Sequence, residues 1–262
     1  AFDSKEKTFR HQMYPDYKAN RDAPPEDLIK QFPYFEPLVK AFNIYSVRVP
    51  GFEADDIMGT LAKKGEQEGL QVVIVSGDKD MMQMISPSIR MLDTMKNKWF
   101  GSDDVVEKFG VTPDRVIDVM GLMGDSSDHI PGVKGVGPKT ASELIKKFGS
   151  IAELYERVEE VDKKKLKEKL VQDKEMALLS RKLVTLNTSM DLEFEFADLV
   201  LKPSNDIELK KLFSEFEFSS LLGELEESST TTESFPEVER RYETILTLEG
   251  LGRWIDLLKQ SN

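Results

Sequence analysis

The chain has no cysteine and, among its 262 residues, only two histidines, His11 and His129. The absence of cysteine excludes disulfides, a thiolate nucleophile and cysteine-ligated zinc or iron–sulfur sites. No apolar run approaches the roughly 18 residues of a membrane span, and no signal peptide opens the sequence. We therefore expect a cytoplasmic protein. Any metal chemistry would use carboxylates, and so hard ions such as Mg²⁺ or Mn²⁺.

The net charge of −12, taken as a total, argues against a nucleic-acid partner. Its distribution matters more than the total. From Glu224 onward nine acidic residues accompany four basic ones, and eight of the earlier carboxylates belong to the motifs described below. Without these eight, residues 1–223 are close to neutral. The acidic residues are therefore clustered in these motifs and in the C-terminal segment and are not spread along the chain.

The first hundred residues alternate between strand-like and helical patterns. Residues 1–3 are typical of the end of a buried strand, and 44–49 is a short strand candidate. Residues 72–75 form the continuous apolar run of a strand buried on both faces. Helical spacing covers 26–42 and 54–68. This alternation predicts an α/β domain with a parallel sheet between helices.

After about residue 100 the pattern changes to helices and glycine turns, with helices expected over 112–122, 138–148 and 173–186. Residues 224–236 are acidic, polar and short of core-forming side chains, which is typical of a linker. The predicted organisation is an α/β core over 1–128, a helical subdomain over 129–223, a linker over 224–236 and the start of a further domain over 237–262.

Three short motifs and the chain start supply eight carboxylates: Asp3, Glu53, Asp55, Asp56, Asp78, Asp80, Asp125 and Asp128. Glu53 and Asp56 share one face at the start of a predicted helix, although acids there also serve as N-caps. The 78–80 and 125–128 pairs could equally be a solvated turn and a capped turn.

The predicted topology brings these acids together. Ligand sites in open α/β sheets form outside the carboxyl ends of strands, where Asp3, Asp78 and Asp80 would lie. Acids so close repel one another unless a cation holds them. The set suits a two-metal phosphodiester site, in which ions about 3.5–4 Å apart activate water and stabilise the leaving oxygen. Eight acids exceed what two ions need directly, so some would act through water.

Residues 130–140 place Gly132, Gly135 and Gly137 ahead of a predicted helix. A P-loop would need lysine at position 138, where proline stands. The better interpretation is a helix–hairpin–helix, whose exposed N–H groups contact a DNA phosphate. Lys134 and Lys139 would add charge that is independent of DNA sequence. The alternative is a plain glycine-rich connection between helices.

Residues 8–21 mix basic and aromatic side chains, including Arg10, Tyr17, Lys18 and Arg21. Such a mixture suits single-stranded DNA through charge and stacking, although an amphipathic helix explains the composition nearly as well. His129 has no second histidine nearby, so a structural or phosphate-contacting role fits it better than metal ligation.

Taken together, these motifs resemble the 5′ nuclease domain of bacterial DNA polymerase I, a relative of flap endonucleases. They occur in the family's order over nearly all of residues 1–223. The matching strings are Phe2-Asp3, Thr8-Phe-Arg10, Tyr17-Lys18 with Arg21, Glu53-Ala-Asp-Asp56, Gly77-Asp-Lys-Asp80, Gly124-Asp-Ser-Ser-Asp128, Ile130-Pro-Gly132 and Gly135-Val-Gly137.

The resemblance implies that all eight carboxylates bind metal directly or through water, with Asp78 and Asp125 essential to catalysis. It implies that Lys18 and Arg21 lie on a helical arch that grips the 5′ strand and the scissile phosphate, with Arg10 and Tyr17 as further DNA contacts. The hairpin would bind duplex DNA and commonly holds K⁺ through backbone carbonyls. Its implied DNA-binding residues are Gly132, Lys134, Gly135, Gly137, Lys139 and Thr140.

The sequence departs from the family in two places. The family normally begins with a strand and a Val-Asp-Gly-type motif carrying another metal-binding aspartate. That portion is absent, so we expect impaired activity of this fragment. His129 stands where the family usually has asparagine. Residues 237–262 look like the entry to a proofreading-type domain, which favours a polymerase fragment over a stand-alone nuclease.

The expected function is a structure-specific 5′-3′ exonuclease and flap endonuclease that hydrolyses DNA with two or more Mg²⁺ or Mn²⁺ ions. Its expected partners are DNA with a 5′ flap, nick or RNA primer and the polymerase domains of the same chain, and we expect a monomer. The alternative is a DNA-binding module that keeps the hairpin and does not cleave.

Overall fold

The structure is a computed structural model that describes residues 1–230, Thr247, Trp254 and Lys259. The chain divides into two compact units, Ala1–Pro203 and Ser204–Asn262. Residues 231–236 of the linker predicted at 224–236 lie outside the described residues, as does most of the domain predicted at 237–262.

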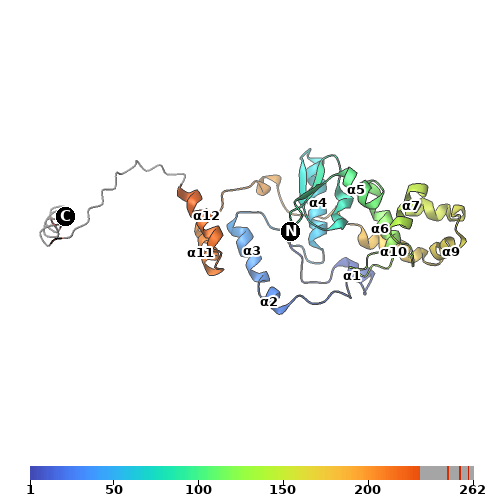
Figure 1. Cartoon of the computed structure of the whole chain (residues 1–262), viewed down its shortest axis with the longest axis horizontal. Coiled ribbons are helices and arrows are strands. Elements are labelled where there is room, and N and C mark those ends of the chain that lie inside the picture. The colour runs from blue at the N-terminus through green and yellow to red at the C-terminus, as the bar shows by residue number, and fades with distance from the viewer. Residues whose placement is uncertain (231–246, 248–253, 255–258, 260–262) are drawn as a thin grey trace. The chain divides into compact units, whose positions relative to one another are not determined.

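The first unit contains a mixed sheet of three strands (Figure 1). β1 (Val72–Val75) pairs in parallel with β2 (Ile89–Asp93), which pairs antiparallel with β3 (Lys98–Phe100). The strands predicted at 1–3 and 44–49 contribute one isolated parallel bridge, between Phe2 and Arg48.

β1 is not buried on both faces, so that expectation was wrong. Ile74 is 4% exposed and packs into the core, whereas Val73 and Val75 are 48% and 56% exposed. Side chains alternate between the two faces of a strand, so Val72 and Ile74 lie on the face that packs on the core, and Val73 and Val75 lie on the other face, which is uncovered. A continuous apolar run therefore does not by itself show that both faces of a strand are covered.

Helix α4 (Ala54–Gln67) packs against β1. Gly65 permits this approach, because a Cβ there would lie only 3.0 Å from Val72 Cγ2. The short 3₁₀ helix η1 (Lys79–Met84) follows β1 and buries Met81, Met82 and Met84 almost completely. The methionines of this segment therefore serve as core residues. Helix α5 (Ser102–Phe109) follows β3 and ends at Gly110, whose φ of 74° is left-handed.

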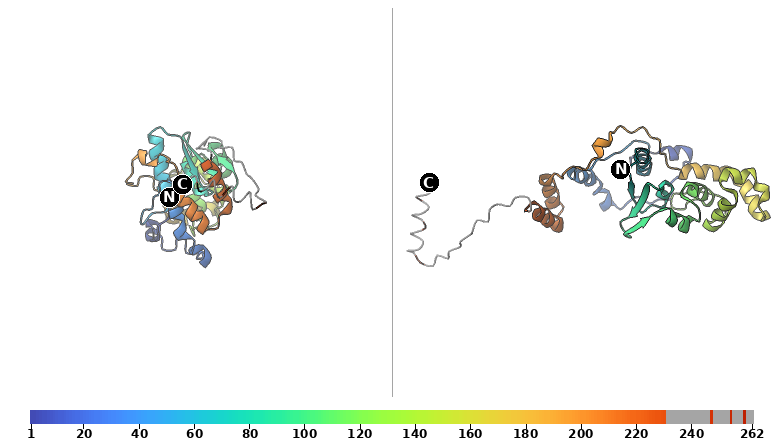
Figure 2. Two further views of the ribbon diagram at one scale, coloured as in Figure 1. Left: turned by 90° about the vertical axis from the view of Figure 1, so that its left-hand side faces the viewer. Right: turned by 90° about the horizontal axis from the view of Figure 1, so that it is seen from above.

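The rest of the first unit is mainly helical, and α7 and α9 lie farthest from the sheet (Figures 1 and 2). Its elements are η2 (Pro113–Arg115), α6 (Val116–Met123), α7 (Pro138–Phe148), α8 (Ile151–Glu156), η3 (Val158–Glu160), α9 (Lys164–Gln172), α10 (Lys174–Val184) and η4 (Phe196–Leu199). One hydrophobic cluster joins residues from both sides of position 128. The domain boundary placed there stays a prediction.

The N-terminal segment forms α1 (Phe9–Met13), α2 (Glu26–Ile29) and α3 (Phe32–Ala41). The single helix predicted over 26–42 is thus interrupted near Lys30. A proline at the start of α3 explains the new helix, because proline is favoured in a first turn and cannot continue a preceding helix.

The described part of the second unit contains α11 (Asp206–Glu215) and α12 (Ser219–Thr230). Residues 224–230 of the predicted linker are therefore helical. Among the described residues, none of the helices is both long and apolar enough to cross a membrane.

Candidate active site

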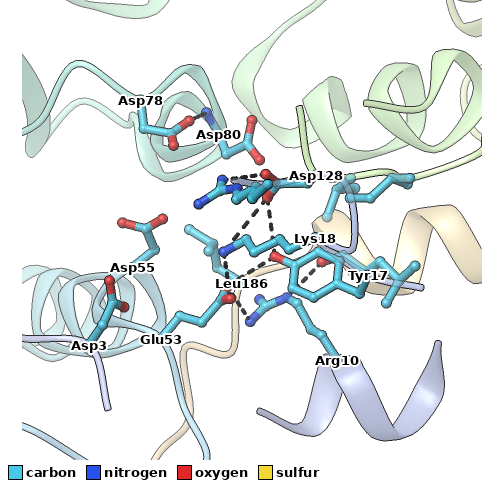
Figure 3. A pocket seen from close by; sticks show the side chains of 14 residues that line it. Asp3, Arg10, Tyr17, Lys18, Glu53, Asp55, Asp78, Asp80, Asp128 and Leu186 are labelled. Carbon is cyan, nitrogen blue, oxygen red and sulfur yellow. Dashed lines mark hydrogen bonds and ion pairs between the residues drawn. The ribbon is translucent and has the colours of Figure 1, made fainter. Parts of the chain in front are cut away.

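A polar pocket of about 180 Å³ lies in the first unit. Six of the eight carboxylates picked out in the sequence line it: Asp3, Glu53, Asp55, Asp78, Asp80 and Asp128. Figure 3 shows Asp3, Glu53 and Asp55 near the start of α4, with Asp78 and Asp80 across from them. Segments far apart in the sequence therefore bring their acids into one cavity.

Local backbone geometry positions these acids. Asp3 accepts a hydrogen bond from the Ala54 N–H at 2.8 Å, at the first residue of α4. Asp78 precedes η1 and accepts from the Asp80 N–H at 2.9 Å. Free N–H groups at a helix start favour carboxylates, and this fixes both side chains at the edge of the pocket.

Asp56 does not line the pocket. It is fully buried, and its two oxygens accept from the guanidinium of Arg10 at 2.7 and 2.8 Å. It also accepts from the Glu53 N–H at 3.2 Å, which is the N-capping alternative considered for this motif. The Asn187 N–H donates to it as well, at 2.8 Å, so Asp56 links the start of α4 to Arg10 and to the segment after α10, and its metal ligation stays a prediction.

Arg10, for which a DNA contact was predicted, is only 2% exposed and lines the pocket. Besides Asp56 it contacts Glu53 at 3.2 Å, and it donates to the carbonyls of Leu183 at 2.8 Å and Thr185 at 3.1 Å. These bonds connect α1, the start of α4 and the end of α10. Arg10 therefore links the three segments of the chain that lie beneath the pocket.

Tyr17, Lys18 and Arg21 approach the acids from a turn between α1 and α2, not from a helix. Lys18 Nζ lies 2.6 Å from Glu53 Oε1, and the Arg21 guanidinium pairs with Asp128. The Tyr17 hydroxyl, which is buried, donates to Glu53 at 3.1 Å and lies 3.2 Å from Asp128. Burial and these two negative charges raise the pKa of Tyr17. Tyr17 is buried but lines the pocket, and its DNA contact stays a prediction.

Asp125 lies outside the pocket lining, 6% exposed, and Lys79 Nζ is 2.6 Å from its carboxylate. The Ser127 N–H donates to the same carboxylate at 2.8 Å. Burial alone would raise the pKa of Asp125, but the hydrogen bonds from Lys79 and Ser127 hold it below the ordinary value. Asp125 is therefore ionised and already neutralised by a lysine.

Asp55 and Asp80 are in the opposite situation. Burial, reinforced by the neighbouring charge of Asp78, raises the pKa of Asp55 to about 6 and that of Asp80 to about 7. Asp80 Oδ1 is buried and has no hydrogen-bond partner. An unpartnered buried carboxylate oxygen is costly, and a proton or a cation would relieve it.

The raised pKa of Asp80 predicts that the stability of the protein in chelator depends on pH. In the native state Asp80 keeps its proton from pH 3.8 up to about 7, whereas the unfolded carboxyl ionises near 3.8. The protonated Asp80 carboxyl therefore makes its largest contribution to the free energy of unfolding below pH 3.8. That contribution is lost as the pH rises to about 7, at a rate on the order of 1 kcal/mol per pH unit. Urea unfolding of the parent and Asp80→Asn, compared at pH 4–8, measures this difference.

In that series the stability of Asp80→Asn relative to the parent is expected to increase with pH and to level off above pH 7. The matched control is Asp103→Asn, which alters an exposed carboxylate on α5. A difference between the parent and Asp80→Asn that stays constant over the range would show that Asp80 is ionised throughout.

The donor set fits a divalent cation by its chemistry, since carboxylate oxygens suit Mg²⁺ and Mn²⁺. Among the described residues, no group of three acidic or histidine side chains is drawn together closely enough to coordinate an ion by itself. Mg²⁺ usually keeps several waters and takes one or two carboxylates together with substrate phosphates. The pocket fits an ion held in that manner, and the unpartnered Asp80 Oδ1 is an available ligand atom.

The glycine hairpin, residues 130–137, joins α6 to α7. Gly132 and Gly135 have left-handed φ values of 61° and 79°. A Cβ on Gly132 would lie 2.4 Å from the Gly124 nitrogen, so two backbone segments touch there. Val133 and Val136 are buried beneath the turn, whereas its exposed residues include Lys134, Gly135, Gly137 and, at the start of α7, Lys139. Thr140 is half-buried.

Sequence reasoning missed part of the pocket. Leu183, Val184 and Leu186, at and just after the end of α10, line it. They carry no chemical signal in the sequence, because they act through backbone carbonyls and apolar contact. Lys79 was also missed as a partner of Asp125, although its place between Asp78 and Asp80 was a usable signal.

Comparisons with known proteins agree with this geometry. Residues 1–110 match the 5′-3′ exonuclease N-terminal resolvase-like domain, and residues 111–207 match the 5′-3′ exonuclease C-terminal SAM fold. A 5′-3′ exonuclease of Aquifex aeolicus is 38% identical over 225 residues, covering 86% of this chain and 76% of that protein. DNA polymerase I of Rhizobium leguminosarum is 45% identical over 220 residues, covering 84% of this chain and 22% of that protein.

Two solved structures have a similar fold. T5 5′-exonuclease with divalent metal ions (zinc) bound has a TM-score of 0.62 and 25% identity, covering 71% of this chain and 73% of that chain. The catalytic core of Rad2 in complex with DNA substrate has a TM-score of 0.52 and 18% identity, covering 79% of this chain and 69% of that chain. The second likeness concerns the fold alone.

A resolvase-like α/β domain with an acidic pocket, followed by a SAM-fold helical domain, defines the class of 5′ nucleases. The chain belongs to the 5′-3′ exonuclease family found in DNA polymerase I. It spans about a quarter of the length of the DNA polymerase I relatives it matches.

Proposed function

We propose that this chain hydrolyses DNA phosphodiesters near 5′ ends as a 5′-3′ exonuclease and flap endonuclease that uses two divalent metal ions. One observation carries the proposal: six carboxylates line a single pocket that also contains Lys18 and Arg21. Such a set can bind both a cation and the phosphate on which that cation acts.

The ion pairs divide the carboxylates into two groups. Glu53, Asp56, Asp125 and Asp128 each have a lysine or arginine partner. Within residues 1–203, four others have no such ion pair: Asp3, Asp55, Asp78 and Asp80. We propose that these four are the ones that hold Mg²⁺ or Mn²⁺, and that the paired acids act through water or after their partners move.

When bound, the ions would lower the pKa of water to generate the nucleophile and would stabilise the leaving oxygen. The chain's own residues supply the rest. Lys18 and Arg21 lie at the pocket, held by Glu53 and Asp128, where they can contact the phosphate on either side of the scissile bond. Tyr17, bonded to both of those acids, keeps them in place.

The glycine hairpin is proposed as the duplex contact. Its exposed backbone at Gly135 and Gly137 can approach a phosphate closely, and Lys134 and Lys139 lie beside it. K⁺ bound to hairpin carbonyls belongs to the same proposal. The substrates would be 5′ flaps, nicks or RNA primers met in replication and repair, with the nuclease carried in a longer polymerase chain.

A 5′-labelled flap substrate tests the proposal. In Mg²⁺ or Mn²⁺ we expect short 5′ products, and in chelator none. If the chain retards the substrate on a gel but yields no product in either metal, it is a non-catalytic DNA-binding module.

Changing the hairpin lysines should weaken duplex binding by the same factor for every DNA sequence. Lys134→Ala with Lys139→Ala removes two phosphate contacts, so the slope of log K against log[salt] should flatten by about 0.9 for each. Fluorescence anisotropy on two unrelated duplexes, across a salt series, measures it. The control is Lys98→Ala on β3, whose lysine pairs with Asp104. A slope equal to that of the parent would contradict the hairpin contact.

A further inference from the structure

The glycine hairpin is closed by a bond of its own, from the Val136 N–H to the Val133 carbonyl at 3.0 Å, and is also bonded to α10. Gly132 is buried, and its N–H donates to the Ser180 hydroxyl at 2.9 Å, across 48 positions of sequence. Ser180 is fully buried on α10. A buried N–H with no acceptor is unfavourable, so this turn depends on the presence of that hydroxyl.

A second bond ties the hairpin to the same helix. The Lys134 N–H donates to Asp173 Oδ2 at 2.9 Å, and Asp173 is the residue immediately before α10. Positions 173 and 180 are two helical turns apart and lie on one face of the helix, about 10 Å from each other. Two successive parts of the hairpin are thus anchored at two points along one rigid element.

The other end of α10 reaches the pocket. The carbonyl of Leu183 accepts from Arg10, and the carbonyl of Val184 accepts from Gln83 Nε2 at 2.9 Å. Arg10 holds Glu53 and Asp56, while Gln83 belongs to η1, the element that carries Asp80. Glu53 is therefore linked through Arg10, and the η1 segment that carries Asp80 is linked through Gln83, to the C-terminal end of α10.

We propose that Asp173 and Ser180 are positioning residues that fix the distance between the duplex-binding hairpin and the acidic pocket, and so determine which phosphodiester is cut. The inference rests on the proposed function. Neither residue contacts DNA in this account. Each accepts a hydrogen bond from a backbone N–H of the hairpin, and the rigid helix α10 connects these bonds to the pocket that holds the carboxylates.

Removing the hydrogen bond to Asp173 or to Ser180 should make the cleavage position less uniform. Asp173→Ala and Ser180→Ala are expected to cut less at the parent site and to add products one nucleotide longer and shorter. One lost hydrogen bond of ordinary strength corresponds to an increase in KM of about 3- to 10-fold, with kcat nearly unchanged. Asp173→Asn keeps an acceptor oxygen at the same place and should restore the parent product. This rescue separates positioning from charge.

The control for charge is Glu175→Ala, since Glu175 is an exposed acid two residues further along the same helix. Removing either acid makes the surface more positive, but only Asp173 bonds the hairpin. Glu175→Ala should therefore keep one cleavage position.

The experiment combines product mapping on a 5′-labelled flap in Mg²⁺ with hydroxyl-radical footprinting of the same duplex in Ca²⁺, using the whole chain. If the parent gives a sharp footprint but no cleavage, the proposed function is wrong. The positioning inference can still be tested in that case, because the footprint edges of both alanine variants should broaden. The positioning inference is overturned if both alanine variants keep the parent product and the parent footprint edges. It is likewise overturned if Asp173→Asn behaves like Asp173→Ala.

Discussion

Replacing Arg10 with alanine is expected to lower the free energy of unfolding by about 3–5 kcal/mol, the range for breaking a buried ion pair by removing one partner. Both partners are inaccessible to water, with Arg10 2% exposed and Asp56 fully buried. The change would leave the Asp56 carboxylate without a positive partner, with only the N–H groups of Glu53 and Asn187 as donors. It would also remove the donor from the carbonyls of Leu183 and Thr185. Urea unfolding near pH 7 measures the loss.

The matched control is Arg48→Ala. Arg48 forms an exposed pair with Glu36 at 3.3 Å, and such pairs contribute about 0–1 kcal/mol. The double variant Arg10→Met with Asp56→Leu should be more stable than Arg10→Ala, since no buried charge remains unpaired. Equal losses for Arg10→Ala and Arg48→Ala would refute a structural role for Arg10.

Replacing Asp80 with asparagine should reduce cleavage by at least about 100-fold, because metal ions supply several kcal/mol of transition-state stabilisation and each 1.36 kcal/mol is tenfold in rate. The same change should raise the melting temperature in chelator at pH 8. It removes a buried charge that lies among other acids and whose Oδ1 has no partner. Loss of activity together with a gain in stability is the signature of a functional carboxylate.

Single-turnover cleavage of a labelled flap and thermal melts measure the two effects. Asp103→Asn, an exposed acid on α5, should change neither. DNA affinity should remain near that of the parent, because the hairpin is a separate contact. An Asp80→Asn variant that cleaves as fast as the parent would remove Asp80 from the site.

Much of the site could be predicted from the sequence because topology constrains it. Asp78 and Asp80 follow β1 directly, and the ends of parallel strands and the starts of the next helices meet at one edge. The fold class was predicted correctly for the same reason, since strand–helix alternation followed by helices and glycine turns permits few architectures.

The pairing of charges could not be predicted. Arg10 finds its acceptors 46 and 173 positions away, at Asp56 and Leu183, and nothing local in residues 8–21 distinguishes a buried arginine from one that faces DNA. The exposure of Val73 and Val75 was missed for a related reason. Whether both faces of a strand are covered depends on which helices pack on the sheet, and this is not encoded within the strand itself.

The central claim is that the pocket binds divalent cations through its unpaired acids, and the binding of Mn²⁺ tests it most directly. Calorimetric titration of the whole chain should show Mn²⁺ binding to the parent. The double variant Asp55→Asn with Asp80→Asn should lose this binding, while Asp103→Asn keeps it. Mn²⁺ that binds the double variant as tightly as the parent, or that does not bind the parent at all, would contradict the account.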